Sequence, residues 1–389
     1  MKFAHFADCH LGSWRQPELQ QLNLESFKKA IDISIQEDVD FVLIAGDLFD
    51  SAYPPIEILE QAFIQLKKLK DNKISCYYIA GSHDYSASGK TFLSVLESAG
   101  FCKNIYVPEE KNETIYLNPI LHENVALYGY PGKKSGMEVA ELRKVKLHES
   151  PGFFKVFALH TCIKSAIGSL PIDSLAEEEI SKAYYYALGY LHIDFELNNF
   201  VYGWPIFPDN FQELEELHHG RFYIINTSPF NYKKIELKLK EVEYLNLELN
   251  NSLIATDRII AEFGKRELKD KIAMLKLEGK LSQGKTSDID FKKIENFVLG
   301  QGAMVLLKST SQLTTEEAQI EIEVENMDKL EEEIIHKYTT QDSSKYDSLV
   351  FPLINSLSVD KQEDETSATF QARLFAELNK ILSTEVKWS

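Results

Sequence analysis

Aspartate and histidine residues recur along this chain directly after apolar, strand-like runs, and this arrangement most constrains how the chain can fold. Runs of β-branched and apolar residues of this length favour buried strands. The polar residues are therefore expected on loops at strand ends. The runs are Lys2–Ala7, Phe41–Ala45, Ser75–Ala80 and Lys155–Leu159, and the polar pieces are Asp8-Cys9-His10, Gly46-Asp47, Gly81-Ser82-His83-Asp84, His160 and Gly189-Tyr190-Leu191-His192.

Helical patterns lie between these strands. Leu24–Glu37 is one, and Ile56–Leu69 is another, with its apolar residues on one face. The alternation of strand and helix predicts an α/β layered domain. Further strands are expected at Thr114–Leu117, Asn124–Tyr130, Tyr184–Leu188 and Phe222–Asn226, with Val242–Leu249 as the last of the series.

A different pattern begins near Asn250 and predicts a small α+β domain. Its expected elements are a helix at Ile254–Phe263, a strand or helix at Leu268–Leu277, a loop at Gly279–Gly284, a helix at Asp290–Val298 and a short strand at Ala303–Leu307. The tail that follows has an expected charged helix (Asp328–Tyr338), a polar linker (Ser356–Ser367) and a last helix (Ala368–Ile381). We thus predict three parts: a large α/β domain (1–249), the small domain (250–315) and an acidic helical tail (316–389).

The charge balance alone argues against nucleic-acid binding, because contacts to phosphate need lysine and arginine. The formal charge is −18, from 42 basic and 60 acidic residues. The acidity is uneven: residues 316–389 hold 7 basic and 17 acidic residues, whereas residues 246–315 hold 11 and 9. Residues 246–315 are therefore not excluded from binding phosphate by their charge.

Other compositional features indicate a protein of the cytoplasm. We find no apolar stretch of 18 residues and no basic region followed by an apolar one, so neither a membrane span nor a secretory signal is expected. The four cysteines lack C-x-x-C spacing, which fits a reducing compartment and argues against a zinc knuckle.

The polar pieces have the chemistry of a metal site. Asp8 and His10 present a carboxylate and an imidazole from one short loop, and Asp47 can supply a carboxylate that bridges two ions. Manganese and similar ions accept this mixture of oxygen and nitrogen donors. Two ions about 3.5–4 Å apart would clamp a phosphate and hold a hydroxide for attack.

The ordered motifs D-x-H, G-D, G-x-H-D, H and G-x-x-H resemble those of the calcineurin-like metallophosphoesterases. Within that superfamily the chain is most similar to the SbcD nucleases and the meiotic-recombination-eleven family. The residues that carry this closer resemblance are Asp8–Gly12, Ala45–Asp50 with Pro54-Pro55, Ala187–His192, Tyr202-Gly203 and the Phe211–Arg221 stretch. The resemblance covers about residues 1–245. It implies a sandwich of two sheets flanked by helices, followed by a capping domain and a tail.

The resemblance also implies two ion sites and shows where this chain departs from them. One ion would be held by Asp8, His10, Asp47 and His192. The other would be held by Asp47 and His160 together with an asparagine and a histidine, which are here replaced by Ser82 and Tyr190. A serine hydroxyl has a shorter reach than an asparagine carbonyl, and a phenol stays protonated near neutral pH. The second site is either weakened or empty, or it is still occupied with an altered metal preference, so we expect one or two ions per chain, most simply manganese.

Two further residues are implied to be catalytic. His83 would donate a proton or stabilise charge at the phosphate, and Asp84 would orient its imidazole. Cys9, between two ligands, is interpreted as a small buried side chain rather than a nucleophile. We assign no role to His5, His122, His148, His218 and His219.

The resemblance implies partners as well. Basic residues of the small domain could contact DNA, although a solvated helix face explains them equally; they are Arg258, Lys265, Arg266 and Lys269. The last helix corresponds in placement to the segment that grips the coiled coil of an SbcC-type ATPase, unless its apolar stripe folds back on its own domain. That stripe is Phe370, Leu374, Leu378 and Ile381. Homodimerisation through the helices near Ile56–Leu69 and Thr91–Leu96 is a further implication.

The expected function is manganese-dependent hydrolysis of phosphodiester bonds at DNA ends during double-strand-break repair, with activity weakened by the changes at Ser82 and Tyr190. Two alternatives stay open. The same fold could be a scaffold for DNA ends and the ATPase that has lost hydrolysis. It could also be a phosphatase or a phosphodiesterase acting on small molecules.

Overall fold

The computed structural model describes residues 1–84, 91–168, 170, 172–315, 352–353, 356–357 and 367–385. The chain divides into two units, Met1–Thr315 and Glu316–Ser389. The first unit holds all the strands among the described residues. In the second, the described part includes helix α11 (Ser367–Glu385).

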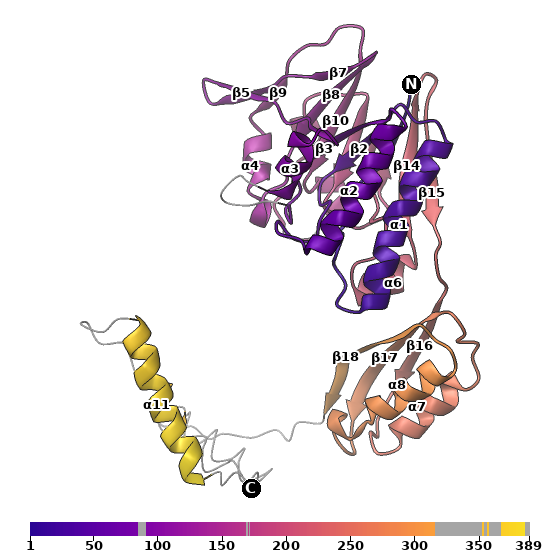
Figure 1. The fold of residues 1–389 in the computed structure, drawn as a ribbon, viewed down its shortest axis with the longest axis vertical. Helices are drawn as coiled ribbons and strands as arrows, with labels where there is room; N and C mark the ends of the chain where they lie inside the picture. Colours follow the sequence, from indigo (N-terminus) through magenta and orange to yellow (C-terminus); the bar gives the residue numbers. More distant parts are fainter. Residues whose placement is uncertain are drawn as a thin grey trace. The chain divides into compact units, whose positions relative to one another are not determined.

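Two six-stranded sheets form the centre of the first unit (Figure 1). The first sheet has the order β15 (Phe230–Leu237), β14 (Gly220–Thr227), β1 (Lys2–Phe6), β2 (Phe41–Ala45), β3 (Ser75–Ile79) and β4 (Lys103–Asn104). The second has the order β12 (Glu196–Leu197), β13 (Phe200–Tyr202), β11 (Tyr185–Gly189), β10 (Phe154–His160), β8 (Val125–Tyr130) and β7 (Ile120–His122).

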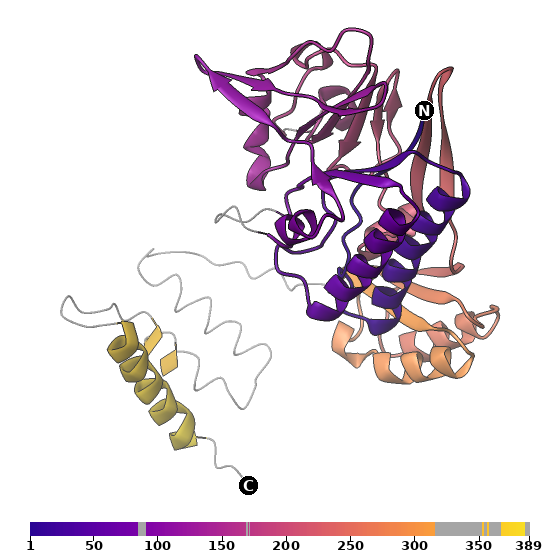
Figure 2. The same ribbon diagram turned by 45° about the horizontal axis from the view of Figure 1, so that its top comes forward.

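Helices cover the outer face of the first sheet. They are α1 (Pro17–Gln36), α2 (Ile56–Asp71) and α3 (Phe92–Ser98), and Figures 1 and 2 show α1 and α2 side by side on this face. Their apolar stripes pack with one face of β1, β2 and β3 in a single buried cluster. The opposite faces of these strands pack against the second sheet in another. Because both faces of β2 are covered, its five residues are all buried.

The outer face of the second sheet has its own cover. A third cluster packs it against α4 (Glu138–Leu142) and a three-stranded sheet formed by β5 (Pro108–Lys111), β6 (Thr114–Leu117) and β9 (Val145–Leu147). Short helical turns complete this region: α5 (Lys164–Ile167) and the 3₁₀ turns η1 (Lys134–Gly136) and η2 (Glu177–Glu179). The layered α/β architecture predicted from the sequence is confirmed.

The strand directions bring the polar loops together. β1, β2 and β3 run parallel in the first sheet, and β8, β10 and β11 run parallel in the second. His160, at the end of β10, pairs in register with Gly189 at the end of β11. Since the carboxyl ends of parallel strands share one edge of a sheet, the loops that follow them meet there.

A separate three-stranded parallel sheet follows, formed by β16 (Val242–Glu248), β17 (Ile272–Leu281) and β18 (Val305–Thr315). We refer to it as the small sheet. Helices α7 (Ala255–Phe263) and α8 (Phe291–Gly300) pack on it through a buried cluster that contains Ile259, Phe263 and Ile294. A 3₁₀ turn, η3 (Thr286–Asp288), precedes α8. Residues 250–315 were predicted to form an α+β domain; the part does combine helices and strands, but they alternate along the chain and all three strands run parallel, which is an α/β arrangement.

Several expected elements differ in detail. β16, expected as the last strand of the first series, pairs with β17 in the small sheet, because pairing depends on a partner distant in sequence. Leu268–Leu277 is not a single element: Asp270 takes a left-handed backbone conformation (φ +61°), and the strand begins after it. That strand runs through Gly279 to Leu281, so the loop expected at Gly279–Gly284 was wrong over its first half. The domain boundaries themselves stay a prediction.

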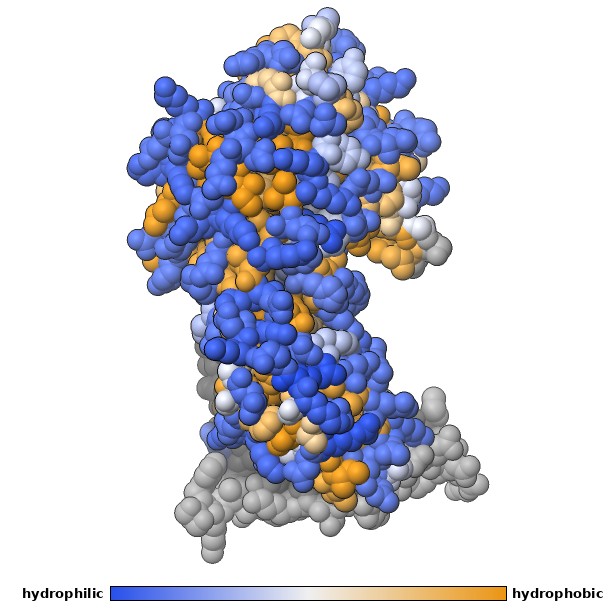
Figure 3. All heavy atoms as spheres, turned by 90° about the vertical axis from the view of Figure 1, so that its right-hand side faces the viewer, coloured by the Kyte–Doolittle hydropathy of each residue, from blue (hydrophilic) through white to orange (hydrophobic). Residues whose placement is uncertain are grey.

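In the tail, the expected last helix is confirmed and slightly longer, as α11. The helix expected at Asp328–Tyr338 lies outside the described residues, as does most of the linker Ser356–Ser367. Among the described residues, no helix combines the length and apolar composition needed to cross a membrane. On the face drawn in Figure 3, hydrophilic residues predominate and hydrophobic ones are scattered among them.

Candidate metal centre

The loops after β1 and β2 hold three of the predicted ligands in a strained backbone. Asp8, His10 and Asp47 all have positive φ values, of 48°, 41° and 49°. Such conformations cost energy in residues with a Cβ and persist only where surrounding contacts enforce them. Here the two loops bind each other: the backbone N–H of Asp8 donates to Gly46 (3.2 Å) and that of His10 to Asp47 (3.0 Å).

Asp8, His10 and His192 form one group of potential ligands, whose donor atoms lie within 4.8 Å of one another. The Nε2 atoms of the two imidazoles are 3.2 Å apart. The His192 Nε2 lies 3.7 Å from Asp8 Oδ1, and the His10 Nε2 lies 3.7 Å from Asp47 Oδ2. Two imidazole nitrogens that face each other beside two carboxylates suit a cation bound between them.

Asp8, Asp47 and His160 form a second group. The Nε2 of His160 lies 3.1 Å from Asp47 Oδ2, yet it is fully buried and makes no hydrogen bond within the described part of the chain. Its Nδ1 lies 3.0 Å from the carbonyl oxygen of Ala45, which therefore accepts the Nδ1 proton. That bond fixes the Nδ1 proton and turns Nε2 toward Asp47, so Nε2 can bind a metal once it gives up its own proton.

Glycines make room for these side chains. A Cβ added at Gly46 would lie 2.1 Å from the His160 Nδ1, and one at Gly132 would lie 2.4 Å from its Cδ2. A Cβ at Gly81 would lie 2.2 Å from Asp47 Oδ1. The glycines of the Gly46-Asp47 and Gly81-Ser82 pieces are thus required by close packing around the site.

The carboxylates control the protonation of these imidazoles. Burial alone would lower the pKa of His160, but the Asp47 carboxylate raises it to about 9. Burial likewise opposes charge on His192, yet Asp8 and Glu213 raise its pKa well above the usual value. The pKa of Asp47 is lowered overall. Burial raises it, but the imidazoles of His160, His10 and His83 together lower it more. Without metal, protons supply the positive charge that a divalent ion would otherwise bring, so metal binding should release protons.

The prediction that Asp84 orients the imidazole of His83 is wrong. Asp84 is buried, and its carboxylate accepts backbone N–H groups from Leu48, Phe49 and Gly81, each at 3.1 Å. It stabilises the loops rather than the imidazole. The Nδ1 of His83 instead lies 2.8 Å from the backbone oxygen of Asp50 and 3.6 Å from its Oδ1.

His83 nevertheless lies at the metal centre. Its backbone N–H donates to Asp47 (2.8 Å), and its ring stacks edge-to-face on His10, with centroids 4.7 Å apart. Its side chain is 47% exposed, so it stands at the mouth of the site. Cys9, by contrast, is fully buried, as interpreted from the sequence, and burial raises its thiol pKa.

Ser82 and Tyr190, where the resemblance implies replaced ligands, lie beside Asp47 and His160, respectively. The Ser82 hydroxyl is 3.4 Å from Asp47 Oδ2. The Tyr190 ring stands edge-on to the His160 ring, with centroids 5.5 Å apart, while its backbone N–H donates to Asp8. Burial and nearby negative groups raise the pKa of the Tyr190 phenol. Both changes therefore fall on the second group and leave the first intact.

Three acidic residues of the site were missed. Asp50 lies 3.3 Å from the His10 Nδ1, Asp209 Oδ2 lies 4.0 Å from the His10 Nε2, and Glu213 Oε1 lies 2.7 Å from the His192 Nδ1. Two of the three lie in segments that carry the family resemblance: Asp50 ends the Ala45–Asp50 motif, and Glu213 lies in the Phe211–Arg221 stretch. Nothing in the sequence showed which imidazole each would contact.

Three of the basic residues proposed for DNA contact strand β16 or helix α7. The side chain of Arg258 donates to the carbonyl of Glu248 (3.0 Å), Lys265 pairs with Glu262 (2.7 Å) and Arg266 pairs with Glu243 (2.6 Å). Lys269 is exposed, as are Arg258 and Lys265. In α11, the four residues of the predicted stripe are half-buried and Phe375 is 63% exposed.

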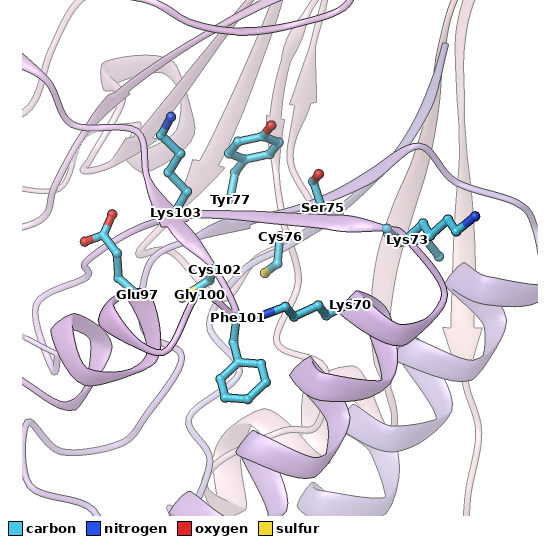
Figure 4. Close-up of a pocket in the computed structure, with 11 residues that line it drawn as sticks. Lys70, Lys73, Ser75, Cys76, Tyr77, Glu97, Gly100, Phe101, Cys102 and Lys103 are labelled. Atoms are coloured by element: carbon cyan, nitrogen blue, oxygen red, sulfur yellow. The ribbon is translucent and has the colours of Figure 1, made fainter.

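A hollow of about 460 Å³ lies away from the metal centre (Figure 4). It is lined at the amino end of β3, by Ser75 and Cys76, whereas the metal loops follow the carboxyl end of that strand. Lys70, Lys73 and Lys103 border it, but their side chains point in different directions in Figure 4. This hollow is therefore separate from the metal site.

Comparison with known proteins agrees with the fold and the donor set. Residues 1–160 match the family model described as calcineurin-like phosphoesterase. Carboxylates and imidazoles at strand ends, with an imidazole nitrogen held ready for an ion, are the chemistry expected of such a domain. This stretch of the chain thus contains a calcineurin-like metallophosphoesterase domain.

Within this superfamily, the matches support the Mre11/SbcD nuclease family. The chain is 27% identical over 310 residues to the DNA double-strand break repair protein Mre11 of Methanocaldococcus jannaschii, covering 76% of this chain and 77% of that protein. It is 28% identical over 213 residues to the protein of the same name from Archaeoglobus fulgidus, covering 50% and 46%. Among solved structures, one described as a novel archaeal phosphodiesterase aligns with a TM-score of 0.28 and 13% identity, over 61% of this chain and 99% of that one.

Proposed function

We propose that this chain is a metal-dependent phosphodiesterase that acts on DNA ends, as the nuclease subunit of an SbcCD-type break-repair complex. The observation that carries the proposal is the convergence of Asp8, His10, Asp47, His160 and His192 from four separate strand ends. The similarity to one break-repair protein over three quarters of the chain, and to another over half of it, supports DNA as the substrate.

The donor set favours manganese or a similar ion. Asp8, His10 and His192 would hold one ion, with Asp47 shared toward a second position at His160. Imidazole nitrogen and carboxylate oxygen together suit such borderline ions. A bound divalent ion would supply Lewis acidity toward the phosphodiester and activate a water for attack.

His83 is the residue best placed to exchange a proton with the substrate. Its Nδ1 faces the backbone oxygen of Asp50, so Nδ1 carries a proton and Nε2 is the atom left for the substrate. Its exposure at the mouth of the site allows contact with the leaving oxygen. Asp50 contacts the Nδ1 side of the ring, opposite the Nε2 atom.

The changes at Ser82 and Tyr190 support weakened rather than ordinary activity. Each replaces a donor group by a hydroxyl, and the Tyr190 phenol is held in its protonated form. The same observation favours a second candidate function, in which the protein is a scaffold for DNA ends and the ATPase and no longer hydrolyses. The scaffold would keep the fold and lose the second ion.

The remaining parts are proposed to serve partners. Arg258, Lys265 and Lys269 would contact DNA phosphates from the capping domain, although the ion pairs of the small domain compete with that role. The stripe Phe370, Leu374, Leu378 and Ile381 of α11 would bind the coiled coil of an SbcC-type ATPase. Homodimerisation would use α2 and α3, where Ile56 is 76% exposed and Val95 is 47% exposed.

The proposal is tested by metal content and hydrolysis together. The purified chain is dialysed against manganese, the bound ions are counted, and cleavage is measured on linear duplex DNA and on small phosphodiesters and phosphomonoesters. One or two ions per chain and manganese-dependent cleavage of duplex DNA are expected. Metal binding without cleavage would favour the scaffold, and cleavage of small esters alone would favour a small-molecule phosphodiesterase. A chain that binds no metal would overturn all three.

A further inference from the structure

Helix α6 (Phe211–Leu217) carries acidic side chains that point to different neighbours. Glu213 contacts the metal centre, Glu215 contacts the small sheet, and Glu216 is exposed, where it accepts a hydrogen bond from Gln212 (2.9 Å). This short helix thus contacts both the metal centre and the small sheet.

Glu213 holds the His192 imidazole in one orientation. Its Oε1 lies 2.7 Å from the His192 Nδ1 and also accepts the Asn210 side-chain amide (2.7 Å), while its Oε2 accepts the backbone N–H of Asp209 (3.1 Å). With both oxygens engaged, the carboxylate has little freedom to move. An acceptor fixed on Nδ1 places the proton there and directs the Nε2 lone pair toward Asp8 and His10.

Glu215 attaches the same helix to the small sheet. Its carboxylate accepts the Lys276 ammonium of β17 at 2.9 and 3.1 Å and the Tyr244 hydroxyl of β16 at 2.5 Å. Both partners of the Lys276–Glu215 pair are about one fifth exposed, so water screens the pair less than a surface ion pair.

Apolar packing reinforces this attachment. Leu214 is fully buried in a cluster that joins α1, the segment around α6 and the small sheet. Trp14, four residues after His10, belongs to the same cluster, and its indole N–H donates to the carbonyl of Pro208 (2.8 Å). The small-sheet members of the cluster are Ile272, Met274, Val305 and Leu307.

We infer that the small sheet positions the Asp8–His10–His192 ligand group through α6, with Glu213 as the positioning residue for His192 and the Glu215–Lys276 pair as the attachment. This inference rests on the proposed metal site and specifies how that site is regulated. Any ligand or partner that shifts the small sheet would change the affinity of this ion, because α6 cannot follow the sheet without moving Glu213. The His160 position is held differently, by the carbonyl of Ala45, and should respond little.

The test compares three variants of one helix, Glu213→Ala, Glu215→Gln and Glu216→Gln, in the full-length chain. Cobalt(II) serves as the probe, because its visible absorption reports ligand geometry as well as affinity. Glu213→Ala should weaken cobalt binding about 10- to 100-fold and alter the absorption spectrum. Glu215→Gln should weaken it by a smaller factor, about 2- to 10-fold, although Glu215 does not reach the ion. Glu216→Gln, the matched control, should bind as the wild type.

Two further measurements separate positioning from simple loss of folding. Glu213→Gln keeps an acceptor for Nδ1 and should recover much of the affinity, and the thermal midpoint of each metal-free variant reports its fold. If folded Glu213→Ala and Glu215→Gln bind cobalt with wild-type affinity and spectrum, the inference is overturned. If the wild type itself binds no cobalt, the proposed metal site fails instead.

Discussion

The carboxylate of Asp50 lies 3.3 Å from the Nδ1 of His10, on the side of the ring opposite the other ligands. The contact is between opposite charges only while His10 is protonated, and the buried Nδ1 makes no aligned hydrogen bond among the described residues. The same carboxylate is 3.6 Å from the His83 Nδ1. One side chain therefore supports both a metal ligand and the residue proposed to exchange protons.

Replacing Asp50 by alanine should lower manganese affinity about tenfold, because outer partners of metal-bound imidazoles contribute on that scale. DNA cleavage should fall slightly further, since His83 loses the 3.6 Å contact with the carboxylate but keeps its hydrogen bond to the Asp50 backbone oxygen. Asp50→Asn keeps an oxygen beside both rings and should retain more of each property. Titration calorimetry and a cleavage assay measure these effects. Asp71→Ala, which removes an exposed carboxylate paired with Lys67, is the control; equal losses in both variants would contradict the assignment.

Restoring donors at the two substituted positions should strengthen the second ion. The double variant Ser82→Asn and Tyr190→His adds a carbonyl oxygen and an imidazole nitrogen beside Asp47 and His160. We expect the manganese count to rise toward two per chain and cleavage of duplex DNA to rise at least about tenfold, on the scale by which a second ion stabilises the attacking and leaving oxygens.

The same double change made together with His160→Ala provides the control, because it lacks a ligand of that site and should show no gain. A second ion that binds without any increase in hydrolysis would favour the scaffold over the enzyme.

Gly46→Ala should disrupt the metal centre sterically. Gly46 has φ +94°, and the added Cβ would lie 2.1 Å from the His160 ring. Gly152 also has a left-handed φ, of +83°, but a Cβ there meets nothing within 4 Å. Gly152→Ala should therefore cost only the backbone strain, about 1–2 kcal/mol, whereas Gly46→Ala should cost more and reduce metal binding.

Chemical denaturation and metal titration of both glycine variants measure this difference. Equal stability and equal metal affinity in the two would show that His160 does not occupy the space beside Gly46.

The buried imidazole of His5 should make the fold sensitive to mild acid. Its Nδ1 lies 2.9 Å from the Tyr185 hydroxyl between the two sheets, and burial lowers its pKa from 6.5 to about 3. Between these values the unfolded chain binds a proton at this position and the folded chain does not. The free energy of unfolding therefore falls as the pH drops from 6.5 toward 3.

His5→Leu should flatten this dependence, by a difference on the order of a few kcal/mol between pH 7 and pH 4. Urea denaturation at a series of pH values gives the slope, which is independent of any constant loss from the missing Tyr185 contact. Parallel curves for the wild type and His5→Leu would refute the prediction.

Much of the metal site could be predicted because its residues are tied to local pattern. Asp8, His10 and Asp47 follow runs whose apolar character marks them as buried strands, and strand ends are where parallel sheets expose side chains. The order of the motifs then indicated the family. The role of Asp84 could not be predicted in this way. Its position next to His83 in the sequence suggested a contact with that imidazole, but in the folded loop its carboxylate accepts the backbone N–H groups of Leu48, Phe49 and Gly81.

By itself, the sequence determined the layered α/β architecture and which donor residues follow the strands, because strand periodicity and residue type are properties of short segments. Only the tertiary structure decided that β16 joins the small sheet, that Asp50 supports His10 and His83, and that Glu213 and Glu215 join the metal centre to the small sheet. These relationships link residues roughly 20 to 60 positions apart. Such contacts depend on how the packed layers bring surfaces together, which no local pattern encodes.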